Sequence, residues 1–296
     1  MDMGWLEDLL ALAESGNFSR AAEARHVTQP AFSRRIRALE DWAGTPLFVR
    51  TRQGAQLTPA GELFARSAPA VVRNLANLRR EARELGSREN ATLHFAATHA
   101  LSFTFFPHWV RAIERRAPVG AVRLVSDTML ACEELMLQGQ AQFLLCHRHP
   151  SAPGRFEPRA FRSVAVGADA LVPYCAPGED GAPRWRLGEG GVLPVLGYSG
   201  ESGLGRILAA QRFAERAAGI ETRFEAQLAA TLQGLAREGS GVAWLPATLA
   251  EQDVARGALV RAGGAEWEVP VEIHLFRPAA RQTPAAERFW SAVAMQ

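Results

Sequence analysis

Hydrophobic residues recur at helical spacing in the first part of the chain. The apolar positions from Trp5 to Ala13 predict a helix that ends at Ser15–Asn17. Ser19 is expected to cap a second, short helix, and a break at His26–Val27 separates that helix from a third. A short helix, a tight turn and a further helix are together typical of a helix-turn-helix unit.

The third helix has an apolar back and a polar front. Thr28 can cap its first turn, Pro30 lies where no N–H donor is needed, and the helix ends near Ala43–Gly44. The apolar side consists of Phe32, Ile36 and Leu39, and the opposite side of Gln29, Ser33, Arg34 and Arg37. Amide, hydroxyl and guanidinium groups hydrogen-bond base edges in the DNA major groove. An ordinary solvated basic surface has the same composition, so both interpretations stay open for this helix alone.

A short hairpin is predicted next. Residues 46–52 form its first strand, Gln53–Gly54 the turn, and Gln56–Leu57 the start of the returning strand. Directly after a helix-turn-helix, such a hairpin is a wing. Arg50 and Arg52 would then contact the DNA backbone or the minor groove.

A long helix is predicted from Thr58 to about Leu85. Its apolar residues are spaced alternately by four and three positions: Phe64, Ala68, Val71, Leu75, Leu78, Ala82 and Leu85. This heptad pattern favours a coiled coil with a second copy of the chain. Packing of the seam on its own domain is the alternative.

Beyond a polar boundary at Gly86–Asn90, predicted strands and helices alternate to the end of the chain. The strands are expected near residues 93–97, 122–125, 143–146, 170–174, 192–196, 241–246 and 271–276. The helices are expected near 102–116, 129–138, 203–218 and 228–238, and from 247 and 284. This alternation predicts an α/β fold with mainly parallel sheets and ligands at the carboxyl ends of strands.

Two of the strand-to-helix junctions, 98–102 and 198–203, offer hydroxyl groups and free helix N–H groups. Together these favour a small anion such as a carboxylate. Simple N-capping by Ser102 and Ser202 explains the same residues. Glu201 argues against an anion, or for one that also carries an amine. His147 and His149 are minor candidates at the edge of the cleft.

Composition supports a globular protein of two or three domains, with 296 residues and 48% hydrophobic content. All 33 basic residues are Arg and the net charge is +2, but residues 17–52 carry seven Arg against three acids, whereas residues 91–296 carry 20 of each. Positive charge gathered on one segment indicates a phosphate-facing module. An acidic, amphipathic N-terminus and the absence of a membrane-length apolar run predict a cytoplasmic protein with no membrane partner.

The residues give little support for an enzyme, a metal site or a cofactor. The cysteines Cys132, Cys146 and Cys175 have no paired spacing, so neither a disulfide framework nor a zinc site is indicated. Neither Ser199 nor Ser202 has the Gly-x-Ser-x-Gly spacing of a nucleophile elbow. We therefore expect no catalytic activity. A thiol redox switch is a further hypothesis, although buried cysteines are usually inert.

Several blocks in order resemble the DNA-binding segment of LysR-type transcriptional regulators: Phe18–Ala22, Thr28–Ser33, Ile36–Glu40, Pro46–Arg50 and Leu57–Gly61. The resemblance implies that Gln29, Pro30, Ser33 and Arg34 read or flank bases of double-stranded promoter DNA. Thr28, Arg50 and Arg52 would hold phosphate, and Arg35 and Arg37 are further candidates.

The same resemblance implies a winged helix-turn-helix (1–57), a linker helix and hinge (58–90), and a two-lobed, periplasmic-binding-protein-like (type 2) effector domain (91–296). Lobe I would comprise 91–163 and 268–296, and lobe II 164–267, with crossing strands near 161–166 and 266–271. It also implies a homodimer through the linker helix, a homotetramer, and a small-molecule effector. Candidate effector-binding residues are Thr98, His99, Leu101, Ser102, His147, Tyr198, Ser199, Ser202 and Gly241.

Further blocks are similar to the hypochlorite-responsive HypT branch of this family: His99–Ser102 with Tyr198–Ser199, and Gly241–Pro246 with Ala286–Trp290. That branch implies sensing by methionine oxidation, which needs accessible thioethers. Met129 and Met136 are candidates, whereas leucines stand at 204 and 228, near the expected cleft. A ligand-switched regulator is therefore preferred. An oxidant-responsive regulator acting through Cys or Met is the alternative.

Overall fold

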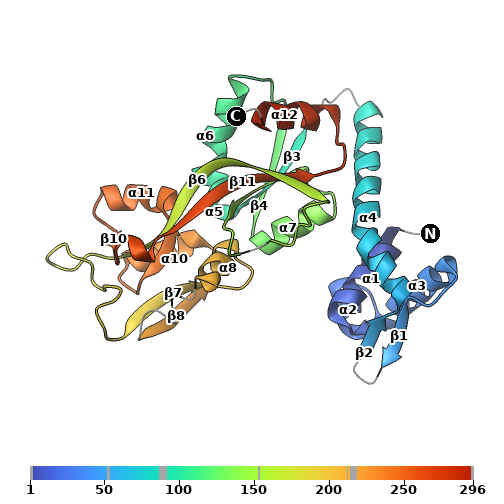
Figure 1. Cartoon of the computed structure of the whole chain (residues 1–296), viewed down its shortest axis with the longest axis horizontal. Coiled ribbons are helices and arrows are strands. Elements are labelled where there is room, and N and C mark those ends of the chain that lie inside the picture. Colours follow the sequence, from blue (N-terminus) through green and yellow to red (C-terminus); the bar gives the residue numbers. More distant parts are fainter. Residues whose placement is uncertain are drawn as a thin grey trace. The chain divides into compact units, whose positions relative to one another are not determined.

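A computed structural model describes residues 3–51, 54–86, 92–152, 154–211, 213 and 219–294 (Figure 1). The chain divides into two compact units. The first consists of the N-terminal 85 residues, and the second of nearly all the rest. No helix within the described ranges combines the length and the apolar character needed to cross a membrane.

The first unit is a winged helix-turn-helix followed by a long helix. Its elements are α1 (Met3–Ser15), α2 (Phe18–Ala24), α3 (Gln29–Ala43), β1 (Phe48–Thr51), β2 (Gly54–Leu57) and α4 (Pro59–Gly86). Strands β1 and β2 pair antiparallel as the wing. The predicted order of helices and hairpin is confirmed.

Backbone geometry at the helix ends explains the turns of this unit. The cap of α2 is Asn17 and not Ser19, because the Asn17 Oδ1 atom accepts hydrogen bonds from the N–H groups of Ser19 (2.9 Å) and Arg20 (3.2 Å). Between α2 and α3 the chain turns at His26, which has a φ of 51°, and α3 ends at Gly44 with a φ of 72°.

The apolar back of α3 packs inward as the spacing predicts. Phe32, Ile36 and Leu39 are buried in one core together with leucines of α1 and Leu47. This packing directs the polar side of α3 outward.

Helix α4 is 28 residues long, roughly 40 Å at 1.5 Å per residue. Its predicted apolar seam divides into two parts. Phe64 and Ala68 pack on the core of their own domain. In contrast, Val71, Leu75 and Leu78 are 39%, 38% and 60% exposed. The side chains of Ala82 and Leu85 lie outside the described set.

The second unit is built on a mixed sheet of seven strands in the order β10-β6-β11-β5-β3-β4, with β9 also paired to β6. The strands are β3 (Leu93–Thr98), β4 (Val122–Asp127), β5 (Phe143–Arg148), β6 (Phe161–Cys175), β9 (Ala243–Pro246), β10 (Val260–Arg261) and β11 (Val269–Pro278). Strand β3 is parallel to β4 and β5, but β6 and β11 pair antiparallel with all their neighbours. The prediction of mainly parallel sheets is therefore wrong, because the long crossing strands run against the others.

Two lobes lie on either side of these crossing strands (Figure 1). The first contains β3, β4 and β5 with α5 (His99–Thr104), α6 (Phe106–Glu114), α7 (Met129–Leu137) and α12 (Pro284–Ala294). The second contains the parallel pair β7 (Leu193–Tyr198) and β8 (Ile220–Ala226), β9, and helices α8 (Gly203–Ala210), α10 (Ala229–Arg237) and α11 (Ala247–Ala255). A short 3-10 turn, η1 (Ala265–Trp267), precedes β11.

Three details differ from the predicted elements. Strands β8 and β10 were not predicted, and β6 is one continuous strand where two were expected. The helix expected from Ser102 begins instead at His99 and breaks at Phe105 into α5 and α6. Ser102 is therefore not a helix cap.

Candidate functional site

The front of α3 presents a contiguous polar surface, which we call the recognition face: Thr28, Gln29, Pro30, Ser33, Arg34 and Arg37. All of these residues are exposed except Ser33, which is half-buried. Thr28 occupies the N-cap position, but its side chain makes no capping hydrogen bond. The recognition face is thus held in place by the buried back of the helix.

Arg35 differs from its neighbours on α3. Its Nη1 atom lies 3.5 Å from Oδ2 of Asp8, a fully buried carboxylate on α1. The other oxygen of Asp8 accepts a hydrogen bond of 2.8 Å from Nε of Arg25, which also pairs with Glu7. The sequence placed Arg35 among the DNA-binding candidates. In the structure its side chain is 42% exposed, and its guanidinium links α3 to α1.

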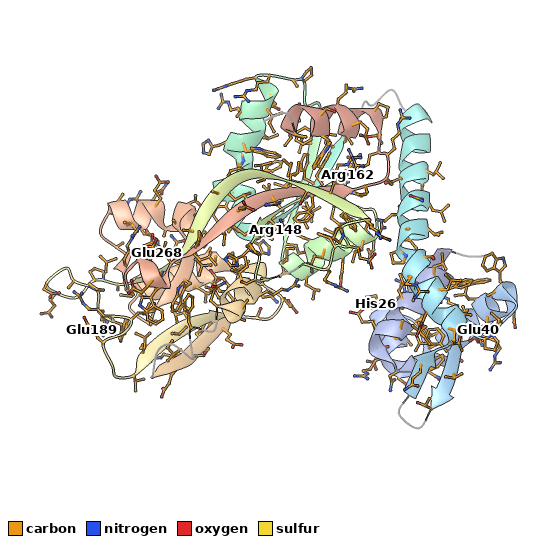
Figure 2. The ribbon with its side chains drawn as sticks, viewed as in Figure 1. His26, Glu40, Arg148, Arg162, Glu189 and Glu268 are labelled. Atoms are coloured by element: carbon orange, nitrogen blue, oxygen red, sulfur yellow. The ribbon has the colours of Figure 1, made fainter. Side chains whose placement is uncertain are left out.

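Glu40 ties the wing to α3 (Figure 2). Its Oε1 atom accepts hydrogen bonds from the N–H groups of Leu47 (2.8 Å) and Phe48 (3.0 Å). The first strand of the wing therefore starts at a fixed place relative to the recognition face. Of the wing arginines, Arg50 lies on β1 with its side chain outside the described set, and Arg52 lies outside the described residues.

A groove of about 250 Å³ runs beside the start of α3. It is lined by Gly16, Asn17, Phe18, Ser19, Gln29, Thr51, Gly54 and Ala55. The groove thus brings together the α1–α2 turn, the recognition face and the wing.

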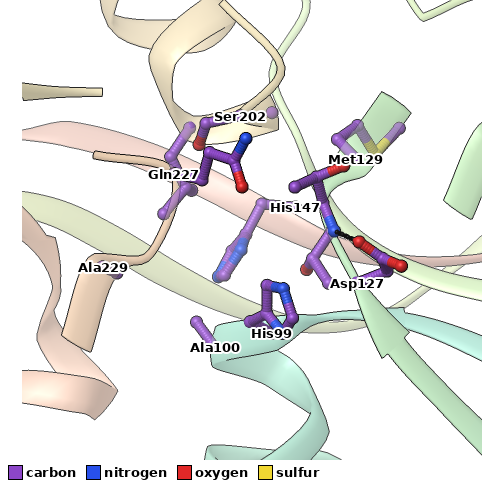
Figure 3. A pocket seen from close by; sticks show the side chains of 12 residues that line it. His99, Ala100, Asp127, Met129, His147, Ser202, Gln227 and Ala229 are labelled. Carbon is purple, nitrogen blue, oxygen red and sulfur yellow. Dashed lines mark hydrogen bonds between the residues drawn. The ribbon is translucent and has the colours of Figure 1, made fainter. Parts of the chain in front are cut away.

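A small pocket lies between the two lobes of the second unit (Figure 3). Its lining consists of Thr98, His99, Ala100, Asp127, Thr128, Met129, His147, Ser202, Gly203, Leu204, Gln227 and Ala229. Most of these residues stand where a strand gives way to a helix, at the starts of α5, α7, α8 and α10. Its volume is about 30 Å³, enough for one or two water molecules.

Four of the predicted effector-binding residues line this pocket: Thr98, His99, His147 and Ser202. The Oγ1 atom of Thr98 and the Nε2 atom of His147 are buried and have no hydrogen-bond partner among the described residues. Polar atoms in that condition are rare and are expected to meet water or a ligand.

The other five do not line the pocket. Leu101 is fully buried in the core of the first lobe, and the Ser102 hydroxyl donates to the carbonyl oxygen of His99 at 2.7 Å. The Tyr198 hydroxyl donates to the carbonyl oxygen of Trp244 at 2.9 Å. The Ser199 hydroxyl is buried and unpaired among the described residues. Gly241 lies against β7, where a Cβ atom would come within 2.6 Å of the Pro194 carbonyl oxygen.

The pocket also contains residues that the sequence did not single out, chiefly Asp127, Thr128 and Gln227, together with Met129, which the sequence offered only as a candidate for oxidation. Asp127 accepts a hydrogen bond from the N–H group of Thr128 at 2.7 Å. These two follow a strand that was predicted, so their junction could have been included on the same argument as Thr98. Gln227 follows β8, which was not predicted.

Comparison with known proteins decides the family. The profile described as "Bacterial regulatory helix-turn-helix protein, lysR family" matches residues 3–62, and that described as "LysR substrate binding domain" matches residues 86–296. The chain belongs to the LysR family. The HTH-type transcriptional regulator YjiE of Escherichia coli K12 is 31% identical over 289 residues, which cover 97% of this chain and 92% of the relative.

Solved LysR structures agree over the whole length. DarR of Vibrio fischeri, solved in complex with DNA, is 30% identical with a TM-score of 0.59, covering 100% of this chain and 99% of DarR. Full-length HypT of Salmonella typhimurium, a hypochlorite-specific LysR-type regulator, is 30% identical with a TM-score of 0.58, covering 99% and 97%. The chain is therefore a LysR-family DNA-binding transcriptional regulator with an effector-binding domain.

One buried network connects the LysR pocket to the crossing strands. Asp169 on β6 accepts hydrogen bonds from the Thr248 hydroxyl (2.5 Å) and the Ala170 N–H group (2.8 Å), and its Oδ2 atom lies 3.6 Å from Nε2 of His147. Burial by itself would raise the pKa of Asp169, but the neighbouring His147 imidazole and the hydrogen bonds from Thr248 and Ala170 outweigh it and hold the pKa below its usual value. Asp169 is therefore an ionised acceptor beside the pocket.

The three cysteines of this LysR protein are buried and unpaired with one another. Burial raises the pKa of Cys132 to about 12, and it raises the pKa of Cys146 and Cys175 as well. Thiolate is the reactive form of cysteine, so these thiols are poorly suited to redox chemistry.

Proposed function

We propose that this chain binds promoter DNA through the recognition face and the wing, and that a small molecule between the lobes switches that binding. The observation that carries the DNA-binding part is the exposure of Gln29, Arg34 and Arg37 on one side of α3, within the segment of concentrated positive charge. Arg50 and Arg52 of the wing would contact phosphate. A regulator of this kind acts in the cytoplasm, where promoter DNA is found.

The test is a matched pair of substitutions, Arg34→Ala and Arg35→Ala, which remove equal charge from adjacent positions. An operator is first selected by the purified protein from a pool of random duplexes. Arg34→Ala should weaken operator binding by about 1–3 kcal/mol and relax sequence preference. Arg35→Ala should change binding by less than about 1 kcal/mol, because the Arg35 guanidinium faces Asp8. Equal losses from the two variants would contradict this assignment.

LysR regulators oligomerise, and we propose that this chain dimerises through Val71, Leu75 and Leu78 of α4, with a tetramer as the further assembly. These side chains are exposed and stand in heptad register. Leu75→Glu with Leu78→Glu should yield monomer in analytical ultracentrifugation. Ala70→Glu, also exposed but off the register, should stay dimeric. A dimer that survives the double substitution would rule this seam out.

For the effector we propose a small carboxylate, one that can also carry an amine. Helix N-terminal N–H groups at α7, α8 and α10 and the Thr98 hydroxyl, which has no hydrogen-bond partner among the described residues, support the carboxylate, while Asp127 supports the amine. A thermal-shift screen of small carboxylates and amino acids on the full-length protein tests this. A true ligand raises the melting temperature by mass action, and Thr98→Val should abolish the shift. A shift that persists in Thr98→Val would place the ligand elsewhere.

A second candidate is an oxidant-responsive regulator of the HypT kind, acting through Met129. Met129 lines the pocket, and the chain is similar in sequence and structure to HypT. Hypochlorite should then convert Met129 to the sulfoxide and change operator binding, and Met129→Leu should remove the change. Unchanged operator binding after full oxidation of Met129 would exclude this candidate.

A further inference from the structure

An ion pair bridges the two lobes of the effector unit outside the pocket. Glu133 lies on α7 in the first lobe and Arg206 on α8 in the second. The Arg206 Nη1 atom lies 3.0 Å and 2.9 Å from the two carboxylate oxygens of Glu133. The Glu133 side chain is fully buried, whereas that of Arg206 is 27% exposed. Neither residue lines the pocket.

Because the Glu133 carboxylate is buried, it depends on Arg206 to offset the cost of its removal from water. A carboxylate removed from water is strongly unfavourable unless it is paired and hydrogen-bonded. Besides Arg206, Glu133 accepts a hydrogen bond from the backbone N–H group of Arg155 at 3.3 Å. If the lobes separate, Arg206 leaves with α8, and among the described contacts the Glu133 carboxylate keeps that weaker bond until water reaches it. The pair therefore favours the closed arrangement.

Other contacts between the two lobes lie along α8. The Leu130 N–H group donates to the Glu201 carbonyl oxygen at 3.3 Å. Gly203 lies so near Met129 that a Cβ atom there would come within 3.1 Å of the methionine side chain. The Gln211 amide donates to the Ser151 hydroxyl at 2.9 Å. These contacts thus run along α8 from before its first turn to just after its last, with the ion pair in the middle.

We propose that Glu133 and Arg206 form a latch that holds the two lobes closed and sets how readily the effector unit opens. The consequence for regulation rests on the proposed function, because an effector can shift lobe closure only by its preference for one state over the other. The latch itself acts without effector or DNA.

Distances between spin labels on the two lobes of the full-length protein measure the latch directly. Cysteines introduced at exposed Arg111 on α6 and Glu251 on α11 take the labels, because the native cysteines are buried. Arg206→Met should lower the ratio of closed to open protein at least tenfold and lengthen the distance distribution. Arg206→Lys, which keeps the charge, should retain most of the closed population.

The matched control is Arg237→Met. Arg237 pairs with Asp253 at 3.5 Å, and both residues belong to the second lobe, so closure should be unchanged. Glu133→Gln supplies a second test if Arg206→Met folds poorly, and it should also favour the open state. Unchanged distances in both latch variants would overturn the proposal, as would equal shifts in Arg206→Met and Arg237→Met. Failure of the protein to select any operator would contradict the proposed function. It would not change the expected spin-label distances, so the two proposals can fail separately.

Discussion

The recognition face and the pocket are built in opposite ways. The recognition face takes its residues from one stretch of helix, Thr28 to Arg37, and they are exposed because the other side of α3 is buried. The pocket gathers residues from Thr98 to Ala229, placed at the starts of α5, α7, α8 and α10. A surface made from one element follows from local periodicity. A pocket made by several elements depends on how the sheet pairs.

The two regions also treat charge differently. On α3 the arginines of the recognition face point outward, and only Arg35 is drawn to a buried acid. In the effector unit, the charged groups near the pocket are buried and bonded, as Asp169 and Glu133 are. Substitutions at the recognition face should therefore alter binding while leaving stability largely intact. Substitutions around the pocket should alter both.

The largest expected effect on stability comes from Asp8, a buried residue behind the recognition face. Asp8→Ala removes the buried carboxylate that Arg25 and Arg35 share, and because both arginines stay partly exposed to water it should destabilise the first unit by about 2–3 kcal/mol through lost charge-assisted hydrogen bonding. Peptide-resolved hydrogen exchange would show faster exchange than in the wild type in α1 to α3, and an unchanged rate in the effector unit. Glu7→Ala removes only the half-buried partner of Arg25 and should lower stability by less than about 1 kcal/mol. Similar exchange in the two variants would mean that the α1–α3 link is unimportant.

Asp169→Asn should have the next largest effect, about 1–3 kcal/mol at neutral pH, because hydrogen bonds to a charged acceptor are weakened. The folded state lowers the pKa of Asp169, so its contribution to stability is fully present above the unfolded pKa of about 3.9. That contribution is lost as the pH falls through the folded pKa.

Chemical denaturation at several pH values measures this dependence. The difference between wild type and Asp169→Asn should therefore shrink below about pH 4. Glu189→Gln, at an exposed carboxylate, is the control and should show little difference at any pH. A constant gap between wild type and Asp169→Asn across this range would show that the Asp169 charge adds no stability.

The helix-turn-helix was predictable because each of its signals is local. Helical spacing, a capping turn and Gly44 at the helix end lie within one short stretch. The effector fold was predictable in outline for the same reason. Strand β8 was missed although its sequence alternates: Ile220, Thr222, Phe224 and Ala226 are separated by the charged residues Glu221, Arg223 and Glu225. That period of two is the pattern of a half-exposed strand and would have predicted it.

The pocket was only half predictable because side chains alternate across a strand and turn with each residue of a helix. Thr98 and Ser202 sit at helix starts and do line it, but Tyr198 and Ser102, within a few residues of them, point elsewhere. Arg35 shows the same limit in the first unit. Composition could not reveal that its partner is Asp8, which comes from a different helix.

Tyr198→Phe should have a smaller effect on stability and none on ligand binding. Its hydroxyl bonds the Trp244 carbonyl oxygen inside the second lobe, so the loss should be about 1 kcal/mol of stability. The ligand-induced thermal shift should stay the same, because Tyr198 does not line the pocket. Denaturant midpoints and the ligand screen measure the two quantities. If Tyr198→Phe kept the wild-type denaturation midpoint but lost the ligand-induced thermal shift, Tyr198 would have to belong to the effector-binding site.

The cysteines give the smallest expected effect. Burial raises the pKa of Cys132 to about 12, so this thiol stays protonated at pH 7, and Cys146 and Cys175 are equally buried. Iodoacetamide should therefore label none of the three in the folded protein on the timescale that labels a cysteine introduced at exposed Arg111. Mass spectrometry of the labelled peptides decides this. Rapid labelling of any native thiol would reopen a thiol switch, whereas protection of all three leaves Met129 as the sulfur that an oxidant could reach through the pocket.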